Sequence, residues 1–306
     1  MKVLVVARCK KGHYAPFISE QVMALKVLGV ECRFFPVNKK GIWGYLLHLS
    51  SLNRAISSFH PDLIHAHYGL SGLLANLQRQ VPVVTTYHGS DINDWKVRPL
   101  SRLSIRLSAF NIFVSRKILD IASPRDKSVL IPCGINLKDY PEMDKNEARL
   151  QMHLSAAGKY VLFSGAFDNY VKNASLAQEA VSRLESVKLI ELKGYSRAEV
   201  STLMYAADVL LMTSLTEGSP QVIKEALACG CPIVSVDVGD VKELTSGISG
   251  CFVIERDSAS IAKALQIALE FDGRTEGRHV IEEKGLSNDV IVRRIMEIYQ
   301  RIIERR

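Results

Sequence analysis

Short apolar runs alternate along the chain with stretches in which apolar residues recur every three or four positions. In the first half, the runs predict β-strands at residues 3–7, 31–37, 62–67, 82–88, 111–115 and 129–132. Between them, helical spacing predicts α-helices at residues 16–28, 45–59, 71–80 and 100–110. Strands that are almost wholly apolar and separated by helices indicate a parallel sheet covered on both faces.

The second half restarts the same cycle after a break at residues 139–159, which hold Pro141 and the charged stretch 144–147. Strands are predicted at residues 160–164, 187–192, 209–213, 232–236 and 251–254, and helices at residues 173–184, 197–207, 219–228 and 258–270. The pattern predicts an α/β protein with two doubly wound, Rossmann-like domains, at residues 1–138 and 139–287. Ligands bind such sheets at the carboxyl ends of the strands, so we expect the two domains to face a cleft.

The final segment, residues 288–306, has the pattern of an amphipathic helix. Its apolar stripe consists of Ile291, Ile295, Ile298, Tyr299 and Ile302. This helix either packs on its own domain or crosses back to the first one, and periodicity leaves both arrangements open.

Composition adds limits to this picture. The chain has 306 residues, of which 47% are apolar and 23% charged, as in ordinary globular proteins. No apolar run approaches the roughly 20 residues that span a bilayer. Residues 1–7 predict a buried strand rather than a signal peptide, and the six scattered cysteines predict reduced thiols. We therefore expect a cytoplasmic protein.

The charge is divided unevenly between the halves. Residues 1–138 hold 19 Lys and Arg against 7 Asp and Glu, whereas residues 139–306 hold 20 against 25. A basic first domain predicts an anionic partner. Residues 39–45 place two lysines beside Trp43 and Tyr45, which suits peripheral association with the inner face of a membrane, although a solvated basic face explains them equally well. Nucleic acid is disfavoured because no recognised motif is present.

The most informative stretch is residues 216–232, which follows a predicted strand and leads into a helix. Ser219 is a good N-cap and Pro220 a good first helical residue, so the free amides at the helix start would suit a phosphate. Glu217 precedes this terminus and Glu225 lies about two turns further on. Carboxylates in these places can accept hydrogen bonds from the vicinal hydroxyls of a sugar or a ribose.

The Glu217-x7-Glu225 spacing, together with residues 226–243, resembles the signature of family 4 glycosyltransferases, which are retaining enzymes of the GT-B fold. Further resemblance lies, in order along the chain, at residues 17–25, 62–69, 87–91, 131–136 and 207–214. The implied activity is transfer of a sugar from a UDP- or GDP-type nucleotide-diphosphate sugar to a glycan or lipid-linked glycan in polysaccharide biosynthesis.

The resemblance implies roles at matching positions. Catalysis would fall to Glu217, at the transferred sugar, to His88, approaching it from the first domain, and to Lys172, neutralising the leaving diphosphate. Donor binding would fall to Glu225, at the ribose, and to Gly218, Ser219, Gly165, Gly12 and Tyr195. The candidates on the acceptor side are His67 and Asp91. The family needs no metal or cofactor, so none is expected.

One position departs from the family. The family usually has an arginine beside the glycine that ends the first strand of the second domain, and here Ala166 follows Gly165. Arg8 and Lys11 are possible substitutes for the missing cation. The departure keeps open a non-catalytic subunit that binds a sugar nucleotide, and the shared architecture keeps open a nucleotide-sugar epimerase.

Two local patterns have alternative explanations. His65 and His67 could be two metal ligands on one strand, but the end of a buried strand favours packing or substrate contact. His88 and Asp91 could form an acid–base pair, or Asp91 could hold a local turn.

Overall fold

The computed structural model describes residues 1–39, 41–124 and 126–305, so Lys40, Arg125 and Arg306 lie outside the described residues, including one lysine of the basic stretch 39–45. The chain divides into two compact units. Unit 1 comprises Met1–Gly134 and Asn288–Arg306, and unit 2 comprises Ile135–Ser287. The chain thus leaves unit 1 four residues before the predicted break.

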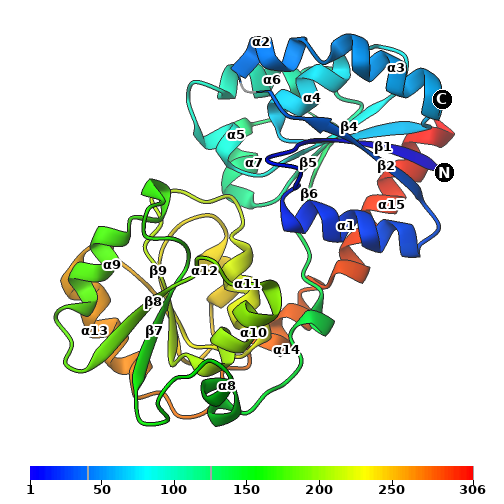
Figure 1. The fold of residues 1–306 in the computed structure, drawn as a ribbon. Helices are drawn as coiled ribbons and strands as arrows, with labels where there is room; N and C mark the ends of the chain where they lie inside the picture. The colour runs from blue at the N-terminus through cyan, green and yellow to red at the C-terminus, as the bar shows by residue number, and fades with distance from the viewer. Residues whose placement is uncertain (40, 125, 306) are drawn as a thin grey trace. The chain divides into compact units, whose positions relative to one another are not determined.

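Unit 1 is built on a parallel sheet with the strand order β2-β1-β3-β4-β5-β6 (Figure 1). The strands are β1 Lys2–Arg8, β2 Glu31–Val37, β3 Leu63–His67, β4 Val83–Tyr87, β5 Phe110–Phe113 and β6 Ser128–Leu130. The helices are α1 Pro16–Val27, α2 Gly41–Leu46, α3 Leu49–Phe59, α4 Gly69–Asn76, α5 Ser90–Asn93, α6 Arg98–Leu107, α7 Arg116–Ala122 and α15 Asn288–Glu304.

The alternation of side chains along β1 explains how this sheet is covered. Leu4 and Val6 join the core formed with α2, α3 and α4. Val3 and Val5 point the other way and pack with α1 and α15. Both faces are therefore apolar, as the near-continuous hydrophobic strands predict.

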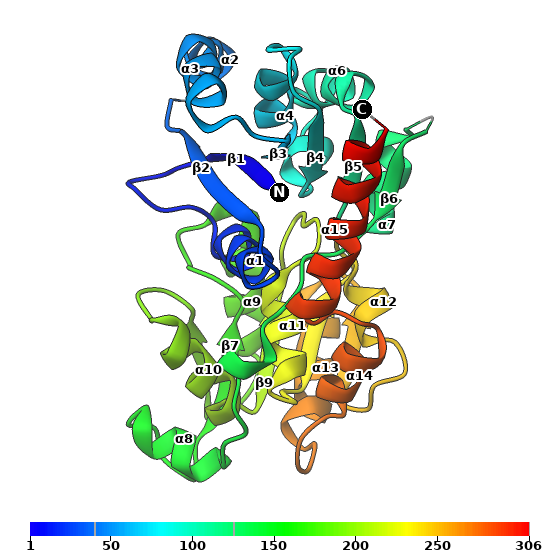
Figure 2. The same ribbon diagram turned by 90° about the vertical axis from the view of Figure 1, so that its right-hand side faces the viewer.

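Helix α15 belongs to unit 1, which resolves the alternative that periodicity left open. Figure 2 shows it beside the sheet, on the side that also carries α1. Its stripe of Ile291, Ile295, Ile298 and Tyr299 is buried in the core. The chain returns to the first unit because this stripe completes the apolar cover of the sheet.

Unit 2 is built on a second parallel sheet, with the order β11-β10-β9-β7-β8. Its strands are β7 Lys159–Phe163, β8 Val187–Glu191, β9 Val209–Met212, β10 Ile233–Val236 and β11 Cys251–Ile254. Its α-helices are α8 Lys145–Gln151, α9 Ala174–Val181, α10 Arg197–Ala206, α11 Gln221–Ala228, α12 Val241–Thr245, α13 Ser258–Leu269 and α14 Gly277–Glu283, and two 3₁₀ turns are Leu137–Asp139 and Tyr170–Lys172. Helices α9 and α13 cover one face, and α10, α11, α12 and α14 pack with the other.

The structure confirms the predicted α/β fold and corrects several predicted bounds. The helix expected at residues 45–59 is two helices, α2 and α3, separated by Leu47 and His48. The charged stretch assigned to the break starts α8, whose first amides bond the side chain of Asp144. Strands are placed well because their apolar runs are continuous, whereas short helices such as α5 and α12 offer too few turns for a period to show.

Candidate active site

In unit 2, the loops after β7 and β9 bring two predicted catalytic side chains together. The Nζ atom of Lys172 lies 2.8 Å from Oε1 of Glu217, and both side chains are less than one-fifth exposed. Lys172 is held there because the Thr213 hydroxyl, at the end of β9, donates to its carbonyl oxygen at 2.9 Å. A Cβ atom on Gly165 would lie 2.9 Å from Cγ of Lys172, so a glycine after β7 leaves room for the lysine stem.

The residues Gly218 and Ser219 lie between this pair and α11. We expected Ser219 to cap the helix, but the expectation was wrong: Pro220 is the N-cap residue and no side chain caps α11. The Ser219 hydroxyl instead donates to Oδ2 of Asp240 at 2.6 Å and accepts from Nζ of Lys224 at 2.8 Å. The side chain of Lys224 is fully buried, and a buried ammonium needs such partners.

The second glutamate of the motif, Glu225, is partly buried on α11. Burial raises the pKa of its carboxyl group, and the cation of Arg197 and the Tyr140 hydroxyl oppose that rise. The Tyr140 hydroxyl also accepts from Nη2 of Arg197 at 3.2 Å. Arg197 and Tyr140 were not predicted from the sequence, because neither lies in a motif and they join Glu225 only through the fold.

The two remaining predicted donor positions of unit 2 lie in loops. Tyr195 follows β8 and is 39% exposed, next to Gly194 with a φ of 84°. Gly165 follows β7, and Ala166 comes next, so no cation extends from that position. Arg256, another residue that sequence analysis missed, donates to the carbonyl oxygens of Ser214 and Leu215 in the loop after β9, at 3.0 and 3.2 Å.

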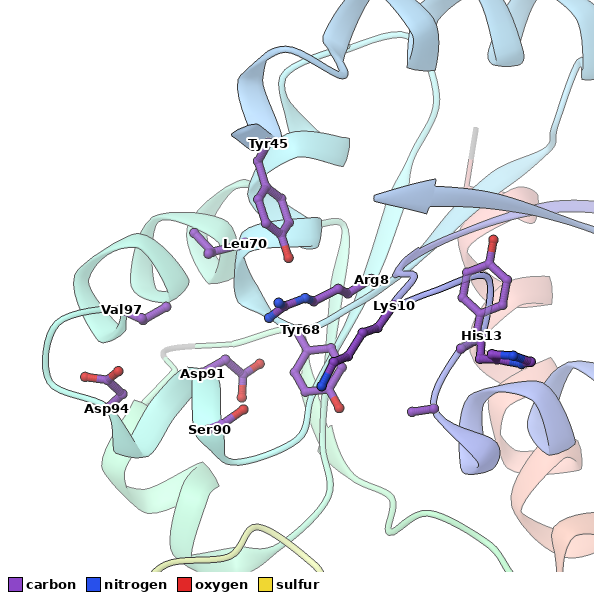
Figure 3. Close-up of a pocket in the computed structure, with 12 residues that line it drawn as sticks. Arg8, Lys10, His13, Tyr45, Tyr68, Leu70, Ser90, Asp91, Asp94 and Val97 are labelled. Atoms are coloured by element: carbon purple, nitrogen blue, oxygen red, sulfur yellow. The ribbon is translucent and has the colours of Figure 1, made fainter. Parts of the chain in front are cut away.

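In unit 1, the ends of β1, β3 and β4 surround a pocket of about 670 Å³ (Figure 3). Arg8 and Lys10 extend into it from the end of β1, and the phenol rings of Tyr45 and Tyr68 line it. Gly12 lies in the adjoining loop with a φ of 85°, which favours glycine.

Asp91 forms part of the pocket wall and organises two loops. Its Oδ2 accepts from the amide of Gly69 at 2.9 Å, and its Oδ1 accepts from the amides of His88 and Gly89 at 3.1 and 2.9 Å. The residue is 4% exposed, and burial raises the pKa of its carboxyl group to about 6, against the opposing effect of these hydrogen bonds. The contacts favour the local-turn explanation of Asp91 over an acid–base pair with the ring of His88.

A row of histidine rings lies at the ends of β3 and β4. Nδ1 of His67 is 3.0 Å from Nε2 of His88, and Nδ1 of His88 is 3.6 Å from Sγ of Cys133. His67 is fully buried and stacks on His65, which contacts the hydroxyl of Tyr299 at 2.5 Å. Burial lowers the pKa of His65 to about 3 and that of His67 well below its usual value, which favours the neutral form of both rings.

Two other kinds of feature are absent from the described residues. No group of three or more His, Cys, Asp or Glu side chains there is arranged to hold a metal ion. None of the helices in residues 1–39, 41–124 and 126–305 is long and apolar enough to cross a membrane.

Two parallel-sheet units of this kind, with polar loops at the strand ends, define a GT-B-type α/β protein. Residues 2–139 match the family described as Glycosyltransferase Family 4, and residues 172–270 match the family described as Glycosyl transferases group 1. Together these matches cover most of the chain, which therefore belongs to the glycosyltransferases of these families.

Individual relatives agree with this assignment. The chain is 26% identical over 237 residues to a protein of Bacillus subtilis (strain 168) named as a teichuronic acid biosynthesis glycosyltransferase, TuaC, covering 67% of this chain and 61% of the relative. The chain spans about three-fifths of the length of the curated relatives it matches.

Two solved structures share the fold. A sucrose-phosphate synthase of Thermosynechococcus elongatus has a TM-score of 0.85 at 16% identity, with all of both chains covered. The HepE protein of Anabaena, in complex with UDP and glucose, has a TM-score of 0.74 at 17% identity, with 97% of this chain and 98% of that chain covered.

Proposed function

We propose that this protein is a retaining glycosyltransferase that moves a sugar from a nucleotide-diphosphate sugar to a glycan or lipid-linked glycan acceptor. The observation that carries the proposal is the Lys172–Glu217 pair, 2.8 Å apart at the carboxyl end of β9 and next to Gly218 and Ser219. It is supported by the membership in glycosyltransferase families and by the solved relative that holds UDP and glucose.

The chemistry of the donor explains why these groups are needed. Cleaving the bond between sugar and phosphate builds negative charge on the diphosphate and positive charge on the anomeric carbon. In the proposal, Lys172 and the amides of Gly218 and Ser219 stabilise the diphosphate, a preorganised electrostatic role. Arg256, which follows β11, adds positive charge beside the loop after β9 and supplies part of what the alanine at position 166 lacks.

The two glutamates would serve different parts of the donor. Glu217 accepts hydrogen bonds from hydroxyls of the transferred sugar, and Glu225 accepts them from the ribose. Arg197 and Tyr140 favour the ionised form of Glu225, which is the form that accepts these bonds. The Tyr195 loop would contact the base, which is that of UDP or GDP in this proposal.

In unit 1, His88 would approach the sugar, and Gly12 would let backbone come close to the substrate. The contact of His88 with His67, 3.0 Å away, fixes the orientation of its ring. We propose retention without a protein nucleophile, in which a donor phosphate oxygen takes the acceptor proton. The reaction is then metal-independent, because Lys172 rather than a divalent cation neutralises the leaving group.

Donor hydrolysis and transfer by the purified full chain test this proposal, with UDP- and GDP-sugars as probes. Glu225→Ala should abolish both activities, while Glu270→Ala, an exposed glutamate at the end of α13, should leave them unchanged. Activity retained in Glu225→Ala would count against the assignment. Donor binding without turnover would favour a non-catalytic subunit, and conversion of the nucleotide sugar without an acceptor would favour an epimerase.

We further propose that unit 1 meets an anionic membrane at the cytoplasmic face, where a lipid-linked acceptor would lie. Trp43 on α2 is 81% exposed and Leu47 is 65% exposed, and the stem of Lys39 lies close to Gly44 of the same helix. Exposed apolar side chains with neighbouring cations suit such a surface.

Trp43→Ser should reduce sedimentation with phosphatidylglycerol vesicles, whereas Val27→Ser, at an 86% exposed residue at the end of α1, should not. Equal sedimentation of the two variants would contradict the membrane proposal.

A further inference from the structure

The pocket of unit 1 combines features that recognise a charged carbohydrate. Two cations, Arg8 and Lys10, extend into about 670 Å³ of space together with the ring faces and hydroxyls of Tyr45 and Tyr68 (Figure 3). We propose that this pocket binds a sugar or polyol that carries a phosphate or carboxylate group, with Arg8 and Lys10 on the anionic group. The proposal rests on the proposed function in one respect: the bound sugar is taken to be the acceptor, or the terminal residue of the acceptor glycan.

The cations are available for such a ligand. Among the residues that the structure describes, neither Arg8 nor Lys10 forms an ion pair with a carboxylate. Asp91 lines the same pocket, but its two oxygens already accept hydrogen bonds from three backbone amides. An arginine without a carboxylate partner presents a planar fork that matches the two oxygens of a carboxylate or phosphate.

The remaining wall suits the uncharged part of the same ligand. Tyrosine rings offer flat apolar faces to the carbon–hydrogen faces of a sugar ring, and their hydroxyls can donate or accept. Asp94 and Ser90, on the wall opposite the β1 loop in Figure 3, provide oxygen acceptors for ring hydroxyls. A neutral sugar would use this wall and leave both cations without a role.

The pocket also decides between two uses of Arg8. Sequence analysis named Arg8 and Lys11 as substitutes for the missing donor-side cation. Figure 3 shows Arg8 extending into the space enclosed by unit 1, and Lys11 is not among the residues described as lining it. Arg8 is therefore assigned to the acceptor anion rather than to the donor diphosphate. With this assignment Arg8→Gln weakens binding of the anionic sugar, whereas with the other it weakens binding of UDP or GDP.

Calorimetric titration of the full chain distinguishes them. The probes are glucose 6-phosphate, glucuronate and glucose, with UDP and GDP titrated into the same preparation. The variants are Arg8→Gln and Lys10→Gln, with Arg54→Gln as a matched control, because Arg54 is exposed on α3 and lies outside the pocket.

We expect at least one anionic sugar to bind more tightly than glucose, and Arg8→Gln to weaken it about tenfold, as the loss of a charge-assisted hydrogen-bond donor implies. Lys10→Gln should weaken it severalfold and Arg54→Gln should not. The preferred probe identifies the anion as a phosphate or a carboxylate.

The inference is overturned if neither anionic sugar binds at concentrations up to about 10 mM, a limit set by weak ligand affinities. It is also overturned if glucose binds as tightly as they do, or if Arg8→Gln weakens the nucleoside diphosphate instead. Failure of the proposed function has a separate signature: neither UDP nor GDP binds, while the anionic sugar still depends on Arg8.

Discussion

Replacing the buried Lys224 of unit 2 tests the physical account of the loop between β9 and α11. Its ammonium group bonds the Ser219 hydroxyl at 2.8 Å and Oε1 of Gln221 at 3.0 Å, and the same hydroxyl donates to Asp240. Burial raises the pKa of the Asp240 carboxyl group, and the nearby charge of Lys224 opposes that rise. Lys224→Met therefore leaves a carboxylate that is 5% exposed without its cation.

The expected cost follows from this geometry. Leaving a buried charge without its counter-charge destabilises proteins by about 3–5 kcal/mol, far more than the roughly 0–1 kcal/mol of an exposed pair. The Ser219 hydroxyl links the buried charges of Lys224 and Asp240. For a unit of this size, each kcal/mol lowers the unfolding midpoint by about 2–4 °C, so we expect a loss of about 6–20 °C. Lys263→Met on α13 is the matched control, because that lysine is exposed.

Thermal denaturation followed by far-ultraviolet circular dichroism measures the fall in the unfolding midpoint, and tryptophan fluorescence adds a separate signal, because both tryptophans, Trp43 and Trp95, lie in unit 1. Adding Asp240→Asn to Lys224→Met should recover part of the stability, since the unpaired charge is then gone. The loss in Lys224→Met should also be smaller at pH 5 than at pH 8, because protonation of Asp240 removes the same charge. If the double variant is no more stable than Lys224→Met, or if Lys224→Met costs no more than Lys263→Met, the account of this network is wrong.

Three further predictions follow from single contacts. Glu217→Gln frees Lys172 for the diphosphate, so the affinity for UDP or GDP should rise severalfold (about 1 kcal/mol) while sugar transfer falls; an unchanged Kd would contradict this. Burial raises the pKa of Asp91 in the folded state to about 6, so the protonated carboxyl group favours the folded state. This contribution to the unfolding free energy is fully present below about pH 4 and is lost as the pH rises through about 6. The unfolding free energy of the wild type, relative to Asp91→Asn, should therefore fall by about 3 kcal/mol between pH 4 and pH 7, and a pH-independent difference would refute the assignment. Tyr299→Phe removes the hydroxyl that contacts His65 and should cost about 1–2 kcal/mol by urea denaturation, whereas a stability equal to the wild type would show that α15 is held by apolar packing alone.

The fold was largely predictable because parallel strands that are buried on both faces have nearly continuous apolar sequences. The strand at Glu31–Val37 has the predicted bounds, and the amphipathic stripe of α15 identified its buried face. The placement of α15 on unit 1 was not predictable, because a stripe states how much apolar surface a helix buries and not which sheet receives it. The polar contact that pairs Tyr299 with His65 joins residues 234 positions apart, and no local pattern reports it.

The candidate site was predictable where its chemically active residues lie in a recognisable sequence motif. The roles of Glu217, Glu225 and Lys172 came from a motif and from resemblance, and the structure places Lys172 against Glu217. Their roles in transfer stay predictions. Arg197 and Tyr140 could not be found, because their relevance comes from burial beside Glu225, which only the packing of α10 creates.

In both units, some polar residues of the strand-end loops fix the loops and others are available for a ligand. This difference explains why the role of Ser219 was predicted wrongly. In each, a buried polar group joins two loops at the carboxyl ends of neighbouring strands: Asp91 gathers amides after β3 and β4, and Ser219 with Asp240 links the loops after β9 and β10. In each unit, a cation lies near the loops so fixed: Arg8 at the end of β1 in unit 1, and Lys172 in the turn after β7 in unit 2. Polar residues in strand-end loops look alike in sequence, because the types that fix a turn also bind a sugar. In unit 1, burial separates them: Asp91, whose oxygens already accept three hydrogen bonds, shapes the loops, and the exposed Arg8 is left to meet a ligand.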